Sequence, residues 1–372
     1  MQRQTNSIAP PGSLVATYRV RSTAADIDAR ATAIAVEQSI EMPAGAVTSD
    51  WVRDIIIGKV LAIRDCGAGV FEARIGLSAE TAGRDAGQLV NMLFGNSSIQ
   101  DDVTLWDFEV PETLLQAFGG PRHGLPGLRE RVGARGRALT ASALKPQGIP
   151  SAALAALAGR LAAGGLDYIK DDHGLADQAF SPFAGRVPLI AKAVRAANPQ
   201  TRYLPNISGT LDQMRVQLAV VRDCGLDTVL IAPMIAGVSA FHNLAAAHPD
   251  IAFITHPALA GASRIAPPAH FGKLFRLFGA DGVVYPNFGG RFSYSPETCR
   301  AVGSVGMADW VGLKSTVPIP AGGMTTERVT EMLDFYGADV MLLIGGGLLS
   351  AGADLTNATA RFVKATHSYR YT

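Results

Sequence analysis

The sequence predicts an α/β protein in which a C-terminal (β/α)8 barrel, or TIM barrel, follows a smaller N-terminal α+β domain of the ferredoxin-like type. The chain has 372 residues, more than one hydrophobic core usually holds. From about residue 137, short apolar or β-branched runs alternate with Ala- and Leu-rich helical stretches. Eight such units over roughly 220 residues match the usual size of the barrel.

Each predicted barrel strand ends in polar, glycine or proline residues. The eight strands are ALTASAL (138–144), LDYIK (166–170), RYLPNI (202–207), DTVLIAP (227–233), AFITH (252–256), GVVYPN (282–287), VPIPAGG (317–323) and DVMLLIG (339–345). Several intervening helical stretches end in glycine, the usual residue just past a helix C-terminus. The main alternative is a doubly wound open sheet, but no GxGxxG follows the first strand, so the barrel is favoured.

Residues 1–135 have a different pattern and are assigned to the α+β domain, which leaves residues 136–372 for the barrel. The segments LVATYRV, KVLAIRD and GVFEARIGL alternate as strands do, and two Ala-rich stretches are helical. The loop GGPRHGLPG (119–127) joins the two domains.

The composition indicates no large partner and no membrane. With 33 basic and 32 acidic side chains and no long basic block, we expect neither nucleic acid nor an anionic membrane as partner. The uncharged stretch 228–249 is interrupted by proline, glycine, asparagine and two histidines, and we interpret it as a strand followed by a helix. Three widely spaced cysteines suggest neither a disulfide framework nor a zinc site, so we expect a cytoplasmic protein.

Ionisable residues cluster at the end of the second predicted strand, where such barrels place their active sites. Lys170, Asp171, Asp172 and His173 stand side by side there. Asp172 and a neighbouring imidazole can hold a hard divalent cation such as Mg2+. A lysine would repel the metal unless burial deprotonates it or it becomes an anionic carbamate. An exposed, self-neutralising turn is the competing interpretation.

Other strand ends carry further candidates. Lys145 could move protons if burial lowered its pKa, although a surface lysine is the default. His256 could bind a substrate hydroxyl or phosphate, or be structural. The pair Gly322-Gly323 and the run 345–347 follow the seventh and eighth strands, where barrels often bind phosphate through backbone N–H groups. Ordinary tight turns are the alternative.

Together these segments resemble the RuBisCO large-subunit superfamily through nearly the whole chain. FGGPRHGLPGLRERVGARGRALTASALKPQG is similar to the family's domain junction and first strand, and GGLDYIKDD to its metal-binding strand. FGNSS and IAVEQS resemble the N-terminal asparagine and glutamate segments, and IPAGG and IGGG resemble the two phosphate loops.

The resemblance implies a role for each matching residue. Lys170 becomes the carbamate, Asp172 binds Mg2+, and Lys145 transfers a proton, with His256 as the strand-five histidine. The implied phosphate and substrate ligands are Gly322, Gly323, Gly345, Gly346, Glu37 and Asn96. In the family, the N-terminal residues complete the barrel site of a neighbouring chain, which implies a homodimer with its active site at the subunit interface.

Several positions depart from the pattern of the carboxylases. His173 replaces a metal-binding glutamate, and Arg291 stands where the carboxylases have the mobile-loop lysine that positions CO2. The remaining departures are Gln147 for a lysine, Pro257 for a phosphate-binding arginine, Val284 for a histidine and Ala321 for a serine. These changes predict a RuBisCO-like protein of form IV that does not fix CO2.

The retained residues predict an enzyme that forms a metal-stabilised enediolate on a phosphorylated sugar acid. Because Arg291 suits a carboxylate, we expect a Mg2+-dependent decarboxylase of 3-oxo-isoapionate 4-phosphate in apiose catabolism, or a transcarboxylase or hydrolase relative. The alternative is an isomerase or enolase-type tautomerase on 5-methylthioribulose 1-phosphate or a related methionine-salvage intermediate. A non-catalytic, ligand-sensing protein is a third hypothesis.

Overall fold

The computed structural model describes residues 2–4, 12–292 and 294–371. It divides into two compact units. The N-terminal unit comprises Met1–Gly119 together with Leu259–His270 and Val311–Leu313. The barrel unit comprises Gly120–Ala258, Phe271–Trp310 and Lys314–Thr372, so the chain first passes from one unit to the other at Gly119–Gly120.

The N-terminal unit contains one antiparallel sheet in the order β1-β3-β4-β2-β5. The strands are β1 (Gln2–Gln4), β2 (Leu14–Arg21), β3 (Lys59–Asp65), β4 (Val70–Leu77) and β5 (Val103–Glu109). The helices are α1 (Ile27–Glu37), η1 (Ala44–Ala46), η2 (Val52–Ile56), η3 (Ala79–Thr81), α2 (Ala86–Phe94), η4 (Asn96–Ile99) and α3 (Glu112–Phe118). From β2 to β5 the order is βαββαβ, which confirms the ferredoxin-like prediction.

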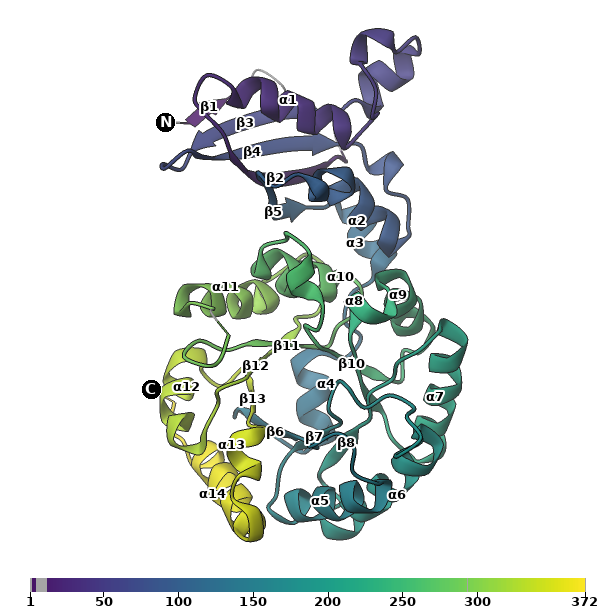
Figure 1. Ribbon diagram of the computed structural model, residues 1–372, viewed down its shortest axis with the longest axis vertical. Helices are drawn as coiled ribbons and strands as arrows, with labels where there is room; N and C mark the ends of the chain where they lie inside the picture. Colours follow the sequence, from purple (N-terminus) through teal and green to yellow (C-terminus); the bar gives the residue numbers. More distant parts are fainter. Residues whose placement is uncertain (1, 5–11, 293, 372) are drawn as a thin grey trace. The chain divides into compact units, whose positions relative to one another are not determined.

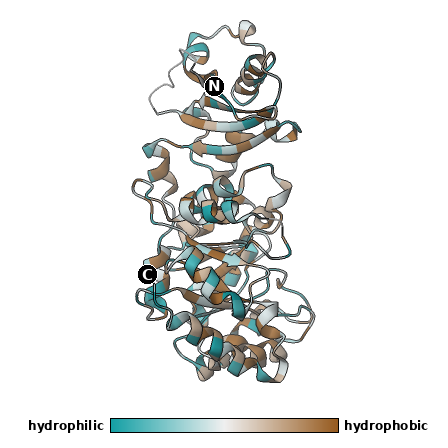
Figure 2. Cartoon of the chain, turned by 90° about the vertical axis from the view of Figure 1, so that its left-hand side faces the viewer, coloured by the Kyte–Doolittle hydropathy of each residue, from teal (hydrophilic) through white to brown (hydrophobic). Residues whose placement is uncertain are grey.

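Alternating side chains explain the sheet. Leu14, Tyr18 and Val20 of β2 are fully buried, and the strands of this unit are coloured both brown and teal along their length (Figure 2). The Tyr18 hydroxyl donates to the Leu93 carbonyl at 2.6 Å and ties α2 to the sheet. Strand β5 was not among the predicted strands. A register shift opposite Thr17 and Tyr18 interrupts its alternation, which hides the period of two that a strand search detects.

The barrel unit contains the eight predicted strands, each in the predicted segment. They are β6 (Leu139–Ala143), β7 (Tyr168–Lys170), β8 (Arg202–Leu204), β9 (Thr228–Ile231), β10 (Ala252–Thr255), β11 (Gly282–Pro286), β12 (Val317–Ala321) and β13 (Met341–Leu343). They form two parallel ladders, β13-β6-β7-β8 and β12-β11-β10-β9. Leu230 exchanges backbone hydrogen bonds with Pro205 and Ile207, and β12 lies beside β13, so the ring closes (Figure 1). The TIM-barrel prediction is confirmed.

Helices surround this ring (Figure 1). They are α5 (Ser151–Ala163), α6 (Phe183–Ala197), α7 (Leu211–Asp223), α8 (Pro233–Ala236), α9 (Val238–Ala247), α10 (Phe275–Leu277), α11 (Pro296–Met307), α12 (Val329–Tyr336), α13 (Gly346–Leu349) and α14 (Leu355–His367). Short helical turns of the barrel unit are η7 (Thr326–Arg328) and η8 (Gly352–Asp354), whereas η5 (Ala260–Ala262) belongs to the N-terminal unit and η6 (Pro268–Leu274) has residues in both units. In the described parts of the chain, no helix is long and apolar enough to cross a membrane.

One helix packs into the barrel itself. Leu125 and Leu128 of α4 (Gly124–Arg131) join the core formed by inward-facing strand residues such as Leu230 and Val284. The Tyr168 hydroxyl of β7 donates to the Leu128 carbonyl at 2.7 Å. The buried helix therefore leaves the opposite, C-terminal end of the strands for the loops.

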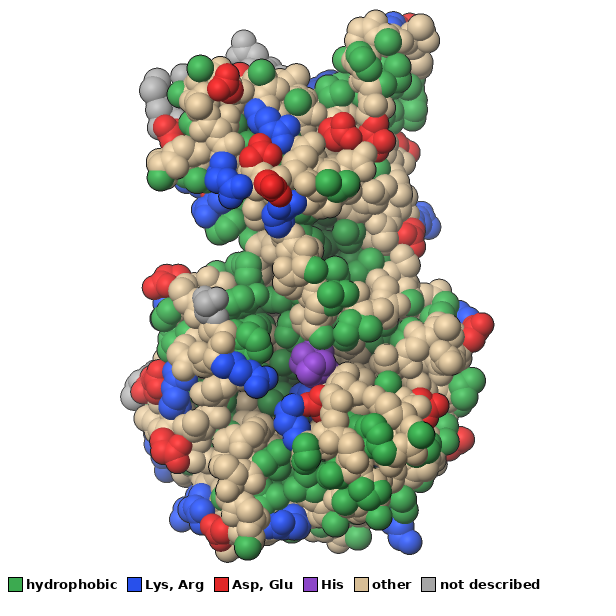
Figure 3. Space-filling view, viewed as in Figure 1, with side chains coloured by type: hydrophobic (Ala, Val, Ile, Leu, Met, Phe, Trp, Pro, Cys, Tyr) green, Lys and Arg blue, Asp and Glu red, His purple; other side chains and the backbone are tan. Residues whose placement is uncertain are grey.

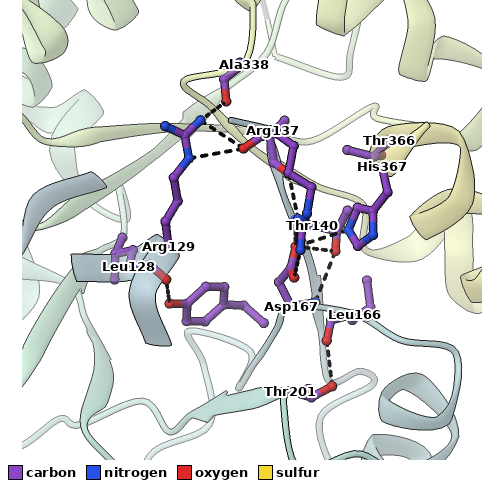
Figure 4. A network of polar contacts seen from close by, with 12 residues as sticks. Leu128, Arg129, Arg137, Thr140, Leu166, Asp167, Thr201, Ala338, Thr366 and His367 are labelled. Atoms are coloured by element: carbon purple, nitrogen blue, oxygen red, sulfur yellow. Dashed lines mark hydrogen bonds and ion pairs between the residues drawn. The ribbon is translucent and has the colours of Figure 1, made fainter. Parts of the chain in front are cut away.

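A buried aspartate fixes the start of β7 (Figure 4). Asp167 accepts two hydrogen bonds from the Arg137 guanidinium, at 2.7 and 2.8 Å, and one from the Thr140 backbone N–H at 2.9 Å. Its carboxylate also lies 3.6 Å from His367 Nε2. Burial alone would raise the pKa of Asp167, but the bonds from Arg137 and His367 outweigh it and hold the pKa at about 2. This network joins β6, β7 and α14 below the site.

Candidate active site

The residues that follow β7 are buried rather than exposed. Lys170 is 5% exposed, Asp171 is fully buried and Asp172 is 2% exposed, whereas the His173 side chain is 39% exposed. An exposed turn of mutually neutralising charges therefore does not describe this segment. Three ionisable groups removed from water at the end of a barrel strand mark the candidate active site.

Lys170 lies in surroundings that destabilise its charged form. Its ammonium nitrogen donates to the Asp171 carbonyl at 2.9 Å. Burial lowers the pKa of Lys170 to about 8, although the nearby Asp172 carboxylate acts in the opposite direction. The neutral amine is the form that can take up a proton or react with CO2 to give a carbamate.

The Asp172 carboxylate is held from three sides. Lys145 Nζ donates to Oδ2, and the Gln147 side-chain amide and the Gly174 backbone N–H donate to Oδ1 at 3.1 and 3.0 Å. Burial alone would raise the pKa of Asp172, but these donors hold it well below its usual range. Asp172 therefore stays ionised, and the predicted residues Lys145, Lys170 and Asp172 form one cluster.

The sequence had marked Gln147 as a departure from the family but not as a site residue. Its amide lies so close to Gly174 that a Cβ at this position would stand 1.6 Å from Gln147 Nε2. Position 174 can be only glycine while Gln147 bonds to Asp172. The sequence signal that could have identified Gln147 as a site residue is its position two residues after Lys145.

Two histidines from different strands stack at the site. The rings of His173 and His256 are 3.9 Å apart between centroids and nearly parallel, at 8°. His256 Nδ1 accepts the Ala258 backbone N–H at 3.1 Å, so the neutral ring carries its proton on Nε2. Burial, helped by the Lys170 charge, lowers the pKa of His256 to about 2, and burial also lowers that of His173. Both rings are therefore neutral near pH 7.

Asp171 had no predicted role, and the structure gives it a supporting one. Its carboxylate accepts hydrogen bonds from Arg186 Nε at 3.3 Å, from the Tyr203 hydroxyl at 2.8 Å and from the Asn206 backbone N–H at 3.1 Å. Burial raises the pKa of Asp171, against the opposing Arg186 charge. Asn206 Nδ2 in turn donates to the His173 carbonyl at 3.1 Å. This network fixes the backbone that carries Lys170 and Asp172.

The two predicted phosphate turns differ in their surroundings. Around Gly345 and Gly346 there is open space where side chains would be, and α13 begins there. Gly322 and Gly323 have φ angles of +80° and +78°, and the loop after β11 packs against them. Arg291 in that loop is exposed, with its guanidinium 5.1 Å from the Phe292 ring centroid.

Cavity volume alone does not locate the site. A cavity of about 430 Å3 is lined by Lys145 and Gly346 together with apolar residues such as Leu157 and Leu349. A larger one, about 690 Å3, lies along α6 and α7 and is lined by none of the predicted residues. Basic, acidic and histidine side chains gather near the middle of one face of the barrel unit (Figure 3). We therefore locate the site by its chemistry, at the C-terminal strand ends.

The two predicted N-terminal residues also meet. Asn96 Nδ2 donates to Glu37 Oε1 at 2.9 Å, although the residues are 59 positions apart. Glu37 ends α1 and Asn96 begins η4, and the Asn96 side chain is exposed. The N-terminal unit thus presents a polar pair on its surface.

The fit to Mg2+ depends on Lys170. Among the described residues, no three His, Cys, Asp or Glu side chains come together. The predicted set has two such ligands, Asp172 and His173, whose Oδ1 and Nδ1 atoms are 3.4 Å apart. A carbamate on Lys170 would supply the third ligand. The lowered pKa of the Lys170 amine suits this modification, because the neutral amine is the form that reacts with CO2. The donor set fits the ion in this form.

Comparison with known proteins shows the family. The family model described as ribulose bisphosphate carboxylase large chain, catalytic domain, matches residues 124–361. A 5-methylthioribulose-1-phosphate isomerase from Rhodospirillum rubrum is 58% identical over 355 residues, which cover 94% of this chain and 95% of that protein. The ribulose bisphosphate carboxylase-like protein 1 of Rhodopseudomonas palustris is 53% identical, covering 96% and 98%.

A solved structure agrees over nearly the whole chain. The crystal structure of a Rubisco-like protein from Rhodopseudomonas palustris superposes with a TM-score of 0.91 at 51% identity, covering 98% of this chain and all of that one. The chain belongs to the RuBisCO large-chain family, within its form IV branch of RuBisCO-like proteins that do not fix CO2. Members of this family generally use Mg2+ and a carbamylated lysine.

The comparisons overturn the predicted decarboxylase. The relative that is 58% identical is named an isomerase, and a more distant one from Geobacillus kaustophilus, 28% identical over 71% of this chain and 67% of its own, is named a 2,3-diketo-5-methylthiopentyl-1-phosphate enolase. Neither name is that of a decarboxylase or of an enzyme of apiose catabolism. The error came from Arg291, because a guanidinium that suits a carboxylate suits a phosphate equally well.

Proposed function

We propose that this protein is an isomerase of 5-methylthioribulose 1-phosphate. The observation that carries the proposal is the buried cluster of Lys145, Lys170 and Asp172 beside a neutral His256, in a chain 58% identical to an enzyme of that name. Isomerising a ketose moves a proton from one carbon beside the carbonyl to its neighbour. It therefore needs a base, an acid and a donor to the oxygen where charge develops, and it has no leaving group.

The residues present can take these parts. Lys145, whose Nζ bonds to Asp172, is placed to accept and return the proton, and so is a carbamate formed on the buried Lys170 amine, which has a pKa of about 8. Because the Ala258 N–H bonds to Nδ1 of His256, the ring carries its proton on Nε2, and this proton can be donated to a substrate oxygen. Mg2+ held by Asp172, His173 and a Lys170 carbamate would polarise the carbonyl group.

The changed positions of the family pattern favour this substrate. Pro257, Val284 and Ala321 replace an arginine, a histidine and a serine of the carboxylases, and Val284 lies inside the barrel core. The edge of the site where the carboxylases bind their second phosphate therefore carries apolar residues in this chain. Such an edge suits a sugar that has one phosphate and an apolar methylthio group at its other end. We assign the phosphate to the open backbone of Gly345 and Gly346.

We also propose a homodimer in which Glu37 and Asn96 complete the barrel site of the second copy. Their side chains are already joined on the surface of the N-terminal unit. Mixing an E37Q chain with a K145M chain tests this, because a shared site regains activity only in the mixed dimer.

The free thiols Cys66, Cys224 and Cys299 accord with the cytoplasm as the proposed location of this protein.

A substrate panel tests the reaction. Purified protein with Mg2+ and bicarbonate is incubated with 5-methylthioribulose 1-phosphate, with the diketo phosphate of the enolase and with 3-oxo-isoapionate 4-phosphate, and the products are followed by 31P NMR. We expect turnover of the methylthio ketose to an isomer of equal mass. Turnover of only the diketo phosphate would replace the isomerase by an enolase, and no turnover would leave the ligand-sensing hypothesis.

A further inference from the structure

Two loops at the C-terminal end of the barrel are in direct backbone contact. A Cβ on Gly290, in the loop after β11, would lie 2.2 Å from the Gly322 carbonyl oxygen. A Cβ on Gly323, in the turn after β12, would lie 2.2 Å from Gly290 Cα. Neither glycine has room for a side chain, so the two loops interlock at this point.

Arg328 bonds to both loops. Its Nη1 donates to the Phe288 carbonyl at 3.2 Å and to the Gly323 carbonyl at 3.5 Å, and its guanidinium lies 5.2 Å from the Phe288 ring centroid. Glu331 accepts from Nε and Nη2, both at 2.8 Å. This paired contact fixes the plane of the guanidinium, so Arg328 holds the two loops at a set distance.

The start of the β11 loop is anchored separately. Asn287 is fully buried, its amide donates to Met324 Sδ at 3.1 Å, and it accepts from the Tyr336 hydroxyl at 2.7 Å. Its backbone N–H donates to the Ala321 carbonyl at 2.8 Å. Displacement of the loop is therefore confined to the residues after Asn287, which include Arg291.

We propose that Arg328 is a positioning residue that sets the distance between Arg291 and the Gly322-Gly323 turn, and so shapes the edge of the site where these two loops receive the substrate. Arg291 follows Gly290 directly, so a loop released from Gly323 carries its guanidinium away. This inference rests on the proposed function, since it takes the substrate to be a phosphorylated ketose. Arg328 itself touches no reacting atom.

Steady-state kinetics of R328Q with 5-methylthioribulose 1-phosphate test the proposal. Losing hydrogen bonds from a charged group predicts a KM about tenfold higher with kcat within about twofold. R328K keeps the positive charge but not the two-pronged guanidinium, so its KM is expected to lie between those of the wild type and R328Q. The matched control is R361Q, because Arg361 pairs with Asp354 on the surface and is 65% exposed. An R328Q enzyme with unchanged KM, or with a loss in kcat alone, would overturn the proposal.

Hydrogen–deuterium exchange provides a readout that needs no activity. In the full-length protein without substrate, amides in 287–292 and 322–325 should exchange faster in R328Q and at the wild-type rate in R361Q. Unchanged exchange in R328Q would also overturn the proposal. If the wild type turns over no methylthio ketose, the proposed function fails, while the exchange result still decides whether Arg328 holds the loops.

Discussion

Replacing Lys170 by methionine should stabilise the fold while it abolishes activity. The side chain is 5% exposed, and burial lowers its pKa from 10.5 to about 8. Since each tenfold change in a proton equilibrium corresponds to about 1.4 kcal/mol, protonated Lys170 costs the folded state up to about 3 kcal/mol near neutral pH. Methionine fills a similar volume and carries no charge.

The stability that K170M gains over the wild type should decrease as the pH rises. Below pH 8 both the folded and the unfolded chain carry a protonated Lys170, so the whole penalty is present. Between pH 8 and 10.5 only the unfolded chain holds the proton, so wild-type stability rises and the advantage of K170M shrinks. Urea unfolding midpoints of both proteins, in CO2-free buffer without metal, measure this difference at each pH.

The matched variant is K145M. Lys145 pairs with the buried Asp172 carboxylate, so its loss leaves that charge without its cation and should destabilise the protein. Opposite signs for K170M and K145M near pH 7 are the expected result. A K170M protein that is less stable than wild type, or a difference that does not change with pH, would refute the reasoning.

Three further predictions concern residues around the site. R186L leaves the Asp171 carboxylate buried without its cation and should lower the free energy of unfolding by about 3–5 kcal/mol, measured in urea; an R186L/D171L double variant should regain part of it. Asp167 has a pKa lowered from 3.8 to about 2, so its contribution of about 2 kcal/mol is present above pH 4 and lost towards pH 2; D167N should show no such slope in that range. G174A drives the Gln147 amide off Asp172 and should reduce kcat about tenfold or more, whereas G174A/Q147A, which removes the clash, should recover at least the activity of Q147A alone.

The sequence predicted the barrel because its strands are short apolar runs between glycine-ended helices, a pattern that local chemistry determines. The same approach missed β5, since the shift opposite Thr17 and Tyr18 breaks the alternation of VTLWDFE. It also placed the barrel domain from residue 136, whereas α4, at Gly124–Arg131, belongs to the barrel unit because its leucines fill the barrel core.

The candidate site was predicted where each residue carries its own signal. Lys145, Lys170 and Asp172 stand at strand ends, and the structure brings them together. The supporting contacts were missed because they join residues distant in sequence. Asp171 meets Arg186 at a separation of 15 residues, and Arg328 reaches Phe288 across 40. No local pattern encodes such pairs, and only folding establishes them.

The most direct test of the account is the mass of the product that this protein forms from 5-methylthioribulose 1-phosphate in D2O. The Lys145 side chain is 41% exposed, so a proton that it carries exchanges with the solvent. We predict an isomer that differs from the substrate's formula only by one deuterium in place of hydrogen, on the carbon beside its new carbonyl, and no such product from K145M. A product that has lost mass, or an isomer without deuterium, would contradict proton transfer by these residues.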